Sequence, residues 1–304
     1  MDNIKTVSFV GMGCLGIMYG NIMAENIGSE NVSFIMGEER FRRHKEDRYM
    51  VNGEEKHFLM RAGDDVKPAD LVVFAVKFND LEDAIKLAEP AVNDDTVIVS
   101  LLNGISSEAV LAETFDREQI VDSICLGMDC VRSGTEILYT KTGHWEVGGR
   151  SEKQKERARQ VKAFCDRAGV SCIIPEDINH AMWNKFMINV GINQTCMVHN
   201  TTYGVARGGS PAYDDLVAAM REVILLAPYE GVNLSEEDLE KNIALLAALD
   251  EEKYPSMQQD ALAGRRSEVE LFAGTMLHLA EKHGIEVPVN RRYYDAIRKI
   301  EENY

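Results

Sequence analysis

A lysine and two asparagines recur at intervals of four residues in the second half of the chain, as Lys185, Asn189 and Asn193. In an α-helix each step of four rotates the side chain by only ~40°, so the three share one stripe. The residues between them are mainly apolar, which predicts a largely buried helix. Because buried lysines and amides need polar partners, the stripe is either a solvated polar face or a cleft wall. A cleft wall of this kind would hold a small polar molecule beside an ammonium group.

A glycine-rich turn follows the first apolar stretch of the chain, and a helix-like segment follows the turn. The first glycine of such a turn allows a tight bend, the second lets the backbone approach a pyrophosphate, and the third lets the helix pack on the strand. The helix N-terminus then directs N–H groups at the phosphates. The turn therefore predicts dinucleotide binding, the alternative being a glycine-rich turn of another α/β protein. Its residues are Gly11, Met12, Gly13, Cys14, Leu15 and Gly16.

Two polar residues, Lys77 and Asn103, each follow an apolar run that reads as a buried strand. Taken alone, Lys77 is equally well a surface lysine and Asn103 a simple turn residue. Ligands of open α/β sheets bind at the carboxyl ends of the strands, on the side of the glycine-rich turn. The position of both residues at such ends therefore favours contact with a cofactor.

Two further polar residues lie in the last third of the chain. Ser256 follows Pro255 at a predicted helix start, which is either an ordinary helix start or a carboxylate seat with free N–H groups at residues 256 and 257. Glu268 lies twelve residues further on and reads, in isolation, as a solvated helix charge.

The elements that would position these residues change in type along the chain. Strands and helices alternate in the first half, which predicts a doubly wound α/β sheet of the Rossmann type. We expect the sheet to end in an antiparallel meander formed by the last strands before a charged helix, 151–169. The predicted strands are 6–10, 32–35, 71–76, 97–102, 120–125, 136–141, 144–147 and 171–174, and the early helices are 17–27 and 80–87.

Nearly everything after residue 177 reads as helix. We therefore predict a dinucleotide-binding domain over residues 1–176 and an all-helical substrate-binding and catalytic domain over 177–304, with no flexible linker. Ser235 and Asp238 resemble a capping box, and Gly284 and Pro288 are expected to close the longest helix. The predicted helices are 181–198, 212–230, 236–250, 256–283 and 291–302.

Composition excludes several classes of partner. The formal net charge of −17 over 304 residues argues against nucleic acid and against an anionic membrane surface. No apolar run is long enough to span a bilayer, and residues 1–5 do not resemble a signal peptide, so a cytoplasmic protein is expected. The six cysteines lack metal-ligand spacing, which predicts reduced thiols and no metal. An apolar helical domain is compatible with a homodimer.

The ordered set of motifs resembles the ketopantoate reductase (2-dehydropantoate 2-reductase) family over almost the whole chain. The set comprises the glycine-rich turn, Lys77, Asn103-Gly104, Trp183-Asn184-Lys185 with Asn189 and Asn193, and the segments 255–260 and 264–268. Each motif is loose by itself, but their order and spacing are specific.

The resemblance implies NADPH-dependent reduction of the 2-keto group of ketopantoate to pantoate, a step toward pantothenate and coenzyme A. By this analogy Lys185 is the general acid, and Asn189, Asn193 and Ser256 bind the substrate. The analogy places Asn103 between nicotinamide and substrate, and it gives contacts with the cofactor to Lys77 and Glu268. Glu268 would also help to orient the catalytic site. The chemistry is coherent, because hydride addition builds negative charge on the carbonyl oxygen, which a positioned proton donor neutralises. The cleft between the two domains would hold both reactants.

The sequence also departs from the family pattern. Gly37 stands where a basic residue commonly holds the 2′-phosphate of NADP, and Glu38 lies about where an NAD-selecting acid would be. Arg40, Arg42 or Arg43 could reach a phosphate instead, so NADP is expected and NAD is the alternative cofactor. Further differences, at Gln194, Tyr203, Glu270 and Ala273, alter the expected pocket wall. Two other functions therefore stay open: reduction of another 2-keto acid, and nucleotide sensing without catalysis.

Overall fold

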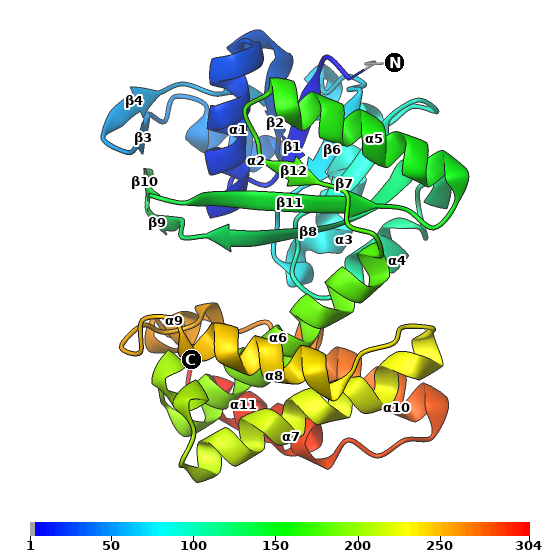
Figure 1. Ribbon diagram of the computed structural model, residues 1–304. Helices are drawn as coiled ribbons and strands as arrows, with labels where there is room; N and C mark the ends of the chain where they lie inside the picture. The colour runs from blue at the N-terminus through cyan, green and yellow to red at the C-terminus, as the bar shows by residue number, and fades with distance from the viewer. Residues whose placement is uncertain (1–3) are drawn as a thin grey trace. The chain divides into compact units, whose positions relative to one another are not determined.

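The computed structural model describes residues 4–304, so residues 1–3 of the N-terminal segment considered above lie outside the described residues. The chain forms two compact units. The first comprises residues up to 102 together with 107–178, and the second comprises residues 103–106 together with 179–304. Figure 1 shows strands with helices in the first unit and helices in the second.

An eight-stranded sheet in the order β12-β11-β8-β7-β6-β1-β2-β5 organises the first unit. Neighbours from β5 to β8 pair in parallel, β11 runs antiparallel to β8, and β12 pairs in parallel with β11. The predicted parallel sheet is confirmed. Its strands are β1 (Val7–Val10), β2 (Val32–Ile35), β5 (Leu59–Arg61), β6 (Leu71–Phe74), β7 (Val97–Ser100), β8 (Ile120–Met128), β11 (Thr142–Gly148) and β12 (Cys172–Ile173).

Helices cover both faces of this sheet because alternate strand residues point to opposite sides. Leu71 and Val73 of β6 join one apolar core with α1 (Cys14–Ile27) and α5 (Glu152–Arg167). Val72 and Phe74 join the other core with α3 (Leu81–Ala88) and α4 (Ser107–Leu111). A short helix, α2 (Glu38–His44), follows β2. This two-sided cover is what the continuous apolar runs predict.

A second, four-stranded sheet in the order β4-β3-β10-β9 was not predicted. Residues 136–141 were expected to extend the main sheet as part of a meander, and this prediction is wrong, because β10 pairs with β3 and β9. The antiparallel part of the prediction is confirmed for β8 and β11, which pair with each other in the main sheet. Three-residue strands carry too short an apolar pattern for their partner to be read from sequence. The strands are β3 (Tyr49–Val51), β4 (Glu54–Lys56), β9 (Val131–Ser133) and β10 (Glu136–Leu138).

The second unit is helical, as predicted. The capping box is confirmed: Asp238 N donates to Ser235 Oγ at 3.3 Å, and Ser235 N donates to Asp238 Oδ2 at 2.9 Å. No helix among residues 4–304 is long and apolar enough to cross a membrane. The helices are α6 (Ile178–His199), α7 (Pro211–Leu226), α8 (Glu236–Ala247), α9 (Ser256–Leu262), α10 (Thr275–His283) and α11 (Pro288–Glu301).

The single long helix expected over residues 256–283 is wrong. Helix α9 ends at Leu262, and Gly264 adopts a left-handed φ of 62° that an α-helix cannot continue. Beyond it, Ser267 donates its N–H and its hydroxyl to Glu301 Oε1 of α11, at 2.7 and 2.6 Å. The chain then forms one π-helical turn, Glu270–Gly274, before α10 begins. The predicted end at Gly284 is confirmed, because this residue is a left-handed C-cap, whereas Pro288 begins α11.

Short 3₁₀ turns connect many of these elements. They are Ser29–Asn31, Gly63–Asp65, Phe78–Asp80, Glu89–Ala91, Arg117–Gln119, Tyr203–Arg207 and Ala227–Glu230.

Candidate active site

The glycine-rich turn lies between β1 and α1. At two of its three glycines, a Cβ atom would clash with the protein backbone. Gly11 has a φ of 108°, and a Cβ there would lie 2.5 Å from the Ala75 carbonyl oxygen. A Cβ at Gly16 would lie 2.2 Å from the Gly11 carbonyl oxygen. A Cβ at Gly13 would meet only Ala75 O, at an ordinary 3.6 Å. The middle glycine therefore leaves space that the described residues do not fill, as a phosphate seat requires.

The N-terminus of α1 offers hydrogen-bond donors at this turn. The first intrahelical bond runs from Ile17 N to Gly13 O at 3.1 Å, and no side chain caps Gly13. The N–H groups of Cys14, Leu15 and Gly16 therefore have no acceptor within the helix. Together with the positive end of the helix dipole, they fit an anionic group such as a pyrophosphate.

One cation at the turn was not predicted. Arg132 of β9 donates from Nη1 to the Met12 carbonyl oxygen, and its guanidinium lies 5.9 Å from the centre of the Tyr49 ring. Arg132 belongs to the four-stranded sheet of short strands, which was not predicted from the sequence. Because β9 is only three residues long, no sequence signal distinguished this arginine.

The predicted basic residues after β2 differ in their contacts. Arg42 pairs with Glu38 at 2.8 Å, and Arg43 pairs with Glu39 at 3.4 Å, both on the exposed surface of α2. Arg40 is exposed and forms no ion pair within residues 4–304. Lys77 is also exposed and lies just beyond the carboxyl end of β6, before the 3₁₀ turn Phe78–Asp80.

In the helical unit, the predicted amides join into one hydrogen-bonded chain. Asn193 Nδ2 donates to Asn189 Oδ1 at 3.2 Å. Asn193 Oδ1 in turn accepts from Ser256 Oγ at 3.1 Å and from Met257 N at 3.2 Å. The expectation that the Met257 N–H is free is therefore wrong, because Asn193 occupies it. Helix α9 has only seven residues, so Ser256 acts here through its hydroxyl and not through a long helix dipole.

One hydrogen-bonding group of Asn189, its amide nitrogen, is not satisfied by residues 4–304 of the protein. Its Nδ2 is buried and has no hydrogen-bond acceptor within the described part of the chain. Buried amide donors are almost always satisfied, so an unsatisfied one beside a polar chain is a candidate contact for a ligand oxygen. Lys185 precedes Asn189 by one turn of α6 and is half-buried.

A second pair of predicted residues meets in the same unit. Asn103 Nδ2 donates to Glu268 Oε2 at 3.1 Å, across 165 residues of sequence. Two contacts hold the Asn103–Ser106 segment there. A Cβ at Gly104 would lie 2.7 Å from Leu271 Cδ1, and the Ser106 and Thr275 hydroxyls are 3.1 Å apart. Glu268 therefore has a specific partner and is not simply a solvated helix charge.

Gln194, one of the departures noted above, is buried and joins three elements. Its Nε2 donates to Val190 O within α6 and to Asn290 Oδ1 of α11, at 2.8 and 3.0 Å. Its Oε1 accepts from Ala273 N in the π-helical turn at 3.1 Å. Gln194 thereby fixes the segment that follows Glu268.

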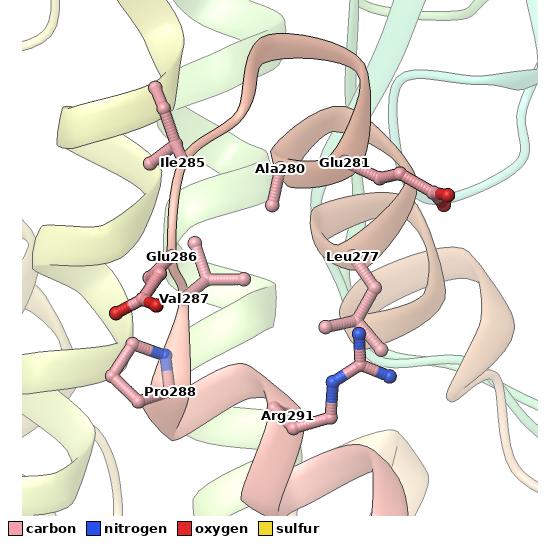
Figure 2. Close-up of a pocket in the computed structure, with 8 residues that line it drawn as sticks. All are labelled: Leu277, Ala280, Glu281, Ile285, Glu286, Val287, Pro288 and Arg291. Carbon is pink, nitrogen blue, oxygen red and sulfur yellow. The ribbon is translucent and has the colours of Figure 1, made fainter.

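A separate cavity of about 540 Å³ lies where α10 connects to α11. Figure 2 shows its lining side chains, which come from α10, the connection and the first turn of α11. None of the predicted catalytic or binding residues lines this cavity. Among residues 4–304, no group of three histidine, cysteine or acidic side chains is placed to hold a metal ion.

Comparison with known proteins matches both halves of the chain to one family. Residues 7–152 match the family described as "Ketopantoate reductase PanE/ApbA", and residues 177–301 match its C-terminal domain. A 2-dehydropantoate 2-reductase of Halobacterium salinarum is 29% identical over 95% of this chain and 96% of its own length. One from Archaeoglobus fulgidus is 26% identical over 98% of each chain.

Solved structures share the fold. A 2-dehydropantoate 2-reductase from Geobacter metallireducens has a TM-score of 0.84 at 22% identity, covering 97% of this chain and 99% of its own. A D-mandelate dehydrogenase, solved with NADH and anilino(oxo)acetate, has a TM-score of 0.85 at 19% identity and covers 98% and 99%.

A Rossmann-type sheet with a glycine-rich turn is the architecture of a dinucleotide-binding protein, and the family matches make it that of an oxidoreductase. The matches over both halves make the assignment specific. The chain belongs to the ketopantoate reductase family.

Proposed function

We propose that this protein reduces ketopantoate (2-dehydropantoate) to pantoate with NADPH, as a step of pantothenate biosynthesis. The observation that carries the proposal is the chain Asn189–Asn193–Ser256, with its unsatisfied Asn189 donor, one helical turn from Lys185. In a member of this family, that arrangement suits a substrate that carries a carbonyl, a hydroxyl and a carboxylate.

The nucleotide would be held by residues 11–16, with Lys77 as a further contact. The space at Gly13 and the N–H groups at the start of α1 support this, since both fit a pyrophosphate. When bound, the nicotinamide supplies the hydride for the carbonyl carbon.

The helical unit would hold the substrate and supply the proton. Lys185 would donate a proton to the carbonyl oxygen, which carries the negative charge that develops as the carbon is reduced. Asn189 Nδ2 would donate to a substrate oxygen, and the Ser256 hydroxyl, which donates its proton to Asn193, would accept a hydrogen bond from the substrate hydroxyl. Asn103 would contact both reactants, with Glu268 holding its amide and contacting the cofactor.

NADP is the proposed cofactor. Arg40 would hold its 2′-phosphate, because Arg42 and Arg43 are each paired with a glutamate of α2. NAD is the alternative. A homodimer is part of the proposal, because the dimeric ketopantoate reductase of Staphylococcus aureus shares the fold, with a TM-score of 0.81.

Reduction of another 2-keto acid is the second candidate. The similarity in fold to a D-mandelate dehydrogenase and the departures at Gln194, Glu270 and Ala273 favour testing it.

The test is an absorbance assay of the purified protein with a panel of 2-keto acids, each with NADPH and NADH. We expect the highest kcat/KM with ketopantoate and NADPH. Higher kcat/KM with another 2-keto acid would establish the second candidate. Nucleotide binding without turnover of any 2-keto acid would instead indicate a sensor.

A further inference from the structure

Two of the six cysteines differ from the others in exposure. Cys125, Cys165, Cys172 and Cys196 are buried, whereas Cys14 and Cys130 are only half-buried, and none of the six is in a disulfide. Buried thiols are usually inert, and reactivity requires access. The two accessible cysteines lie 116 residues apart in sequence, yet they meet at the glycine-rich turn.

The contact between them is direct. Cys130 Sγ donates to the Cys14 carbonyl oxygen at 3.4 Å, which places the two cysteines side by side. Cys14 is the first residue of α1, and Cys130 lies between β8 and β9. Arg132, two residues beyond Cys130, donates to Met12 O. One hairpin thus brings a thiol and a guanidinium to the same turn.

The surroundings make the two thiols unequal. The neighbouring Cys130 thiol lowers the pKa of Cys14, burial opposes this, and the charge of Arg132 lowers the pKa further. The neighbouring Cys14 thiol, together with burial, raises the pKa of Cys130. Cys14 also stands at a helix N-terminus, where a thiolate is favoured. Cys14 is therefore the nucleophile, and Cys130 is the thiol that can resolve its oxidised form.

We propose that Cys14 and Cys130 are a redox modification site, which a hydroperoxide converts to a disulfide and which competes with the nucleotide for the glycine-rich turn. The Cys14 thiolate attacks a peroxide oxygen, the O–O bond breaks, and Cys14 becomes a sulfenic acid. Cys130 sulfur then attacks Cys14 sulfur, and the S–O bond breaks with release of water. In sum, two thiols and one hydrogen peroxide give one disulfide and two waters, with two electrons passing from sulfur to peroxide.

The competition rests on the proposed nucleotide site. A pyrophosphate bound at the start of α1 would cover Cys14, and a disulfide would tie that same residue to Cys130. Because the disulfide would hold Cys14 where the phosphates bind, the oxidised protein should bind the nucleotide more weakly, and bound nucleotide should in turn favour the dithiol over the disulfide. Redox state would thereby control cofactor binding.

The chain contains its own comparison pair. Cys165 and Cys172 are also neighbours, but both are buried in the apolar core between α5 and the sheet. The neighbouring Cys172 thiol, together with burial, raises the pKa of Cys165. If proximity alone decided oxidation, this pair would react as well. Accessibility and a favoured thiolate predict that it does not.

The experiment treats the full chain with hydrogen peroxide and maps its peptides under non-reducing conditions. We expect a linked Cys14–Cys130 peptide, a fall in titratable thiols from six to four, and no Cys165–Cys172 link. In Cys130→Ser, Cys14 should stay as a sulfenic acid that dimedone traps. Absence of the linked peptide, with Cys14 reduced or irreversibly oxidised, would overturn the proposal.

A second arm repeats the oxidation with saturating NADP⁺, after a titration that measures NADP⁺ binding to the reduced protein. We expect NADP⁺ to slow formation of the disulfide about tenfold, because it covers Cys14, and we expect oxidation to weaken NADP⁺ binding about tenfold. If NADP⁺ binds and the oxidation rate does not change, the proposed competition is wrong. If NADP⁺ does not bind while the disulfide forms, the proposed function fails and the dithiol stands.

Discussion

At the scale of single residues, the two amides of α6 perform different tasks. Asn193 uses its oxygen twice and its nitrogen once in contacts with other protein groups, so it holds α9 against α6. Asn189 accepts one of these bonds and keeps a buried donor without an acceptor in the described residues. Asn193 therefore positions α9 against α6, and Asn189 is the better candidate for a direct contact with substrate.

This difference predicts that two matched substitutions affect different quantities, one the stability and the other the KM. Asn193→Ala removes three hydrogen bonds and should lower the free energy of unfolding by about 1–3 kcal/mol, measured by urea denaturation. Asn189→Ala should cost less than about 1 kcal/mol in stability and raise the KM for ketopantoate roughly tenfold, the equivalent of one lost hydrogen bond. Equal loss of stability with no change in KM for Asn189→Ala would contradict the assignment.

Glu108 predicts a pH dependence of stability. Burial, with Asp122 nearby, raises the pKa of Glu108 to about 7 from 4.5. The folded protein thus holds a proton that the unfolded chain releases, and stability falls as pH rises from about 4.5 to about 7. The slope contributed by this group is roughly 1.4 kcal/mol per pH unit within that window and vanishes above it.

Glu108→Gln should remove this contribution, because an amide does not titrate and can still accept from the Ser107 hydroxyl. The measurement is urea denaturation at pH values from 5 to 8, with the exposed Glu113→Gln as control. Parallel stability curves for Glu108→Gln and the unsubstituted protein would show that Glu108 does not titrate in this range.

Residue-level prediction from sequence succeeded where spacing on one element carried the information. The common stripe of Lys185, Asn189 and Asn193 follows from helical periodicity. The bond between Asn103 and Glu268 could not be read in this way, because it joins residues that only folding brings together. Nothing in the pattern indicated that Arg132 reaches the glycine-rich turn.

At the scale of elements, the turn between β1 and α1 predicts a contrast between two glycines. Gly11→Ala should destabilise the fold by at least about 2 kcal/mol, since it combines a left-handed φ with a clash against Ala75. Gly13→Ala meets no such clash and should cost about 1 kcal/mol or less. It should nevertheless weaken nucleotide binding, because a methyl group enters the space proposed for the pyrophosphate.

Thermal unfolding and a nucleotide titration separate these effects. A Gly13→Ala variant that keeps both its melting temperature and its nucleotide affinity would argue against phosphate binding at this turn. Gly11→Ala serves as the comparison that perturbs the fold itself.

The wrong prediction of one helix over residues 256–283 has an element-level cause. The apolar period continues through the segment, but Gly264 and the bonds from Ser267 to Glu301 interrupt the helix. The tertiary contacts of Gln194 with Ala273 then stabilise a π-helical turn. Local periodicity contains no information on such partners, so the interruption beside Glu268 was not predictable.

At the scale of the whole molecule, the alternation of strands and helices followed by helices alone was sufficient to predict the fold class. Buried parallel strands and long helices have strong patterns, whereas the four-stranded sheet of three-residue strands does not. Residues 103–106 belong with the helical unit although they follow β7, so one cut in the sequence does not describe the units.

The charge of the whole molecule also bears on the proposed reaction. A net charge of −17 repels an anionic keto acid and an anionic nucleotide at long range. Under the proposed function, binding would have to come from local groups, for which the N–H donors of α1, Arg132 and Lys185 are the candidates.

The proton donor is the part of this account on which the proposed reaction depends, and one measurement tests it directly. It is kcat/KM for NADPH oxidation with ketopantoate by Lys185→Ala, with NADPH binding measured on the same sample and the exposed Lys241→Ala as control. The account predicts a loss of about 10²–10⁴-fold in kcat/KM with nucleotide affinity retained, and no loss for Lys241→Ala. Full turnover by Lys185→Ala would contradict it.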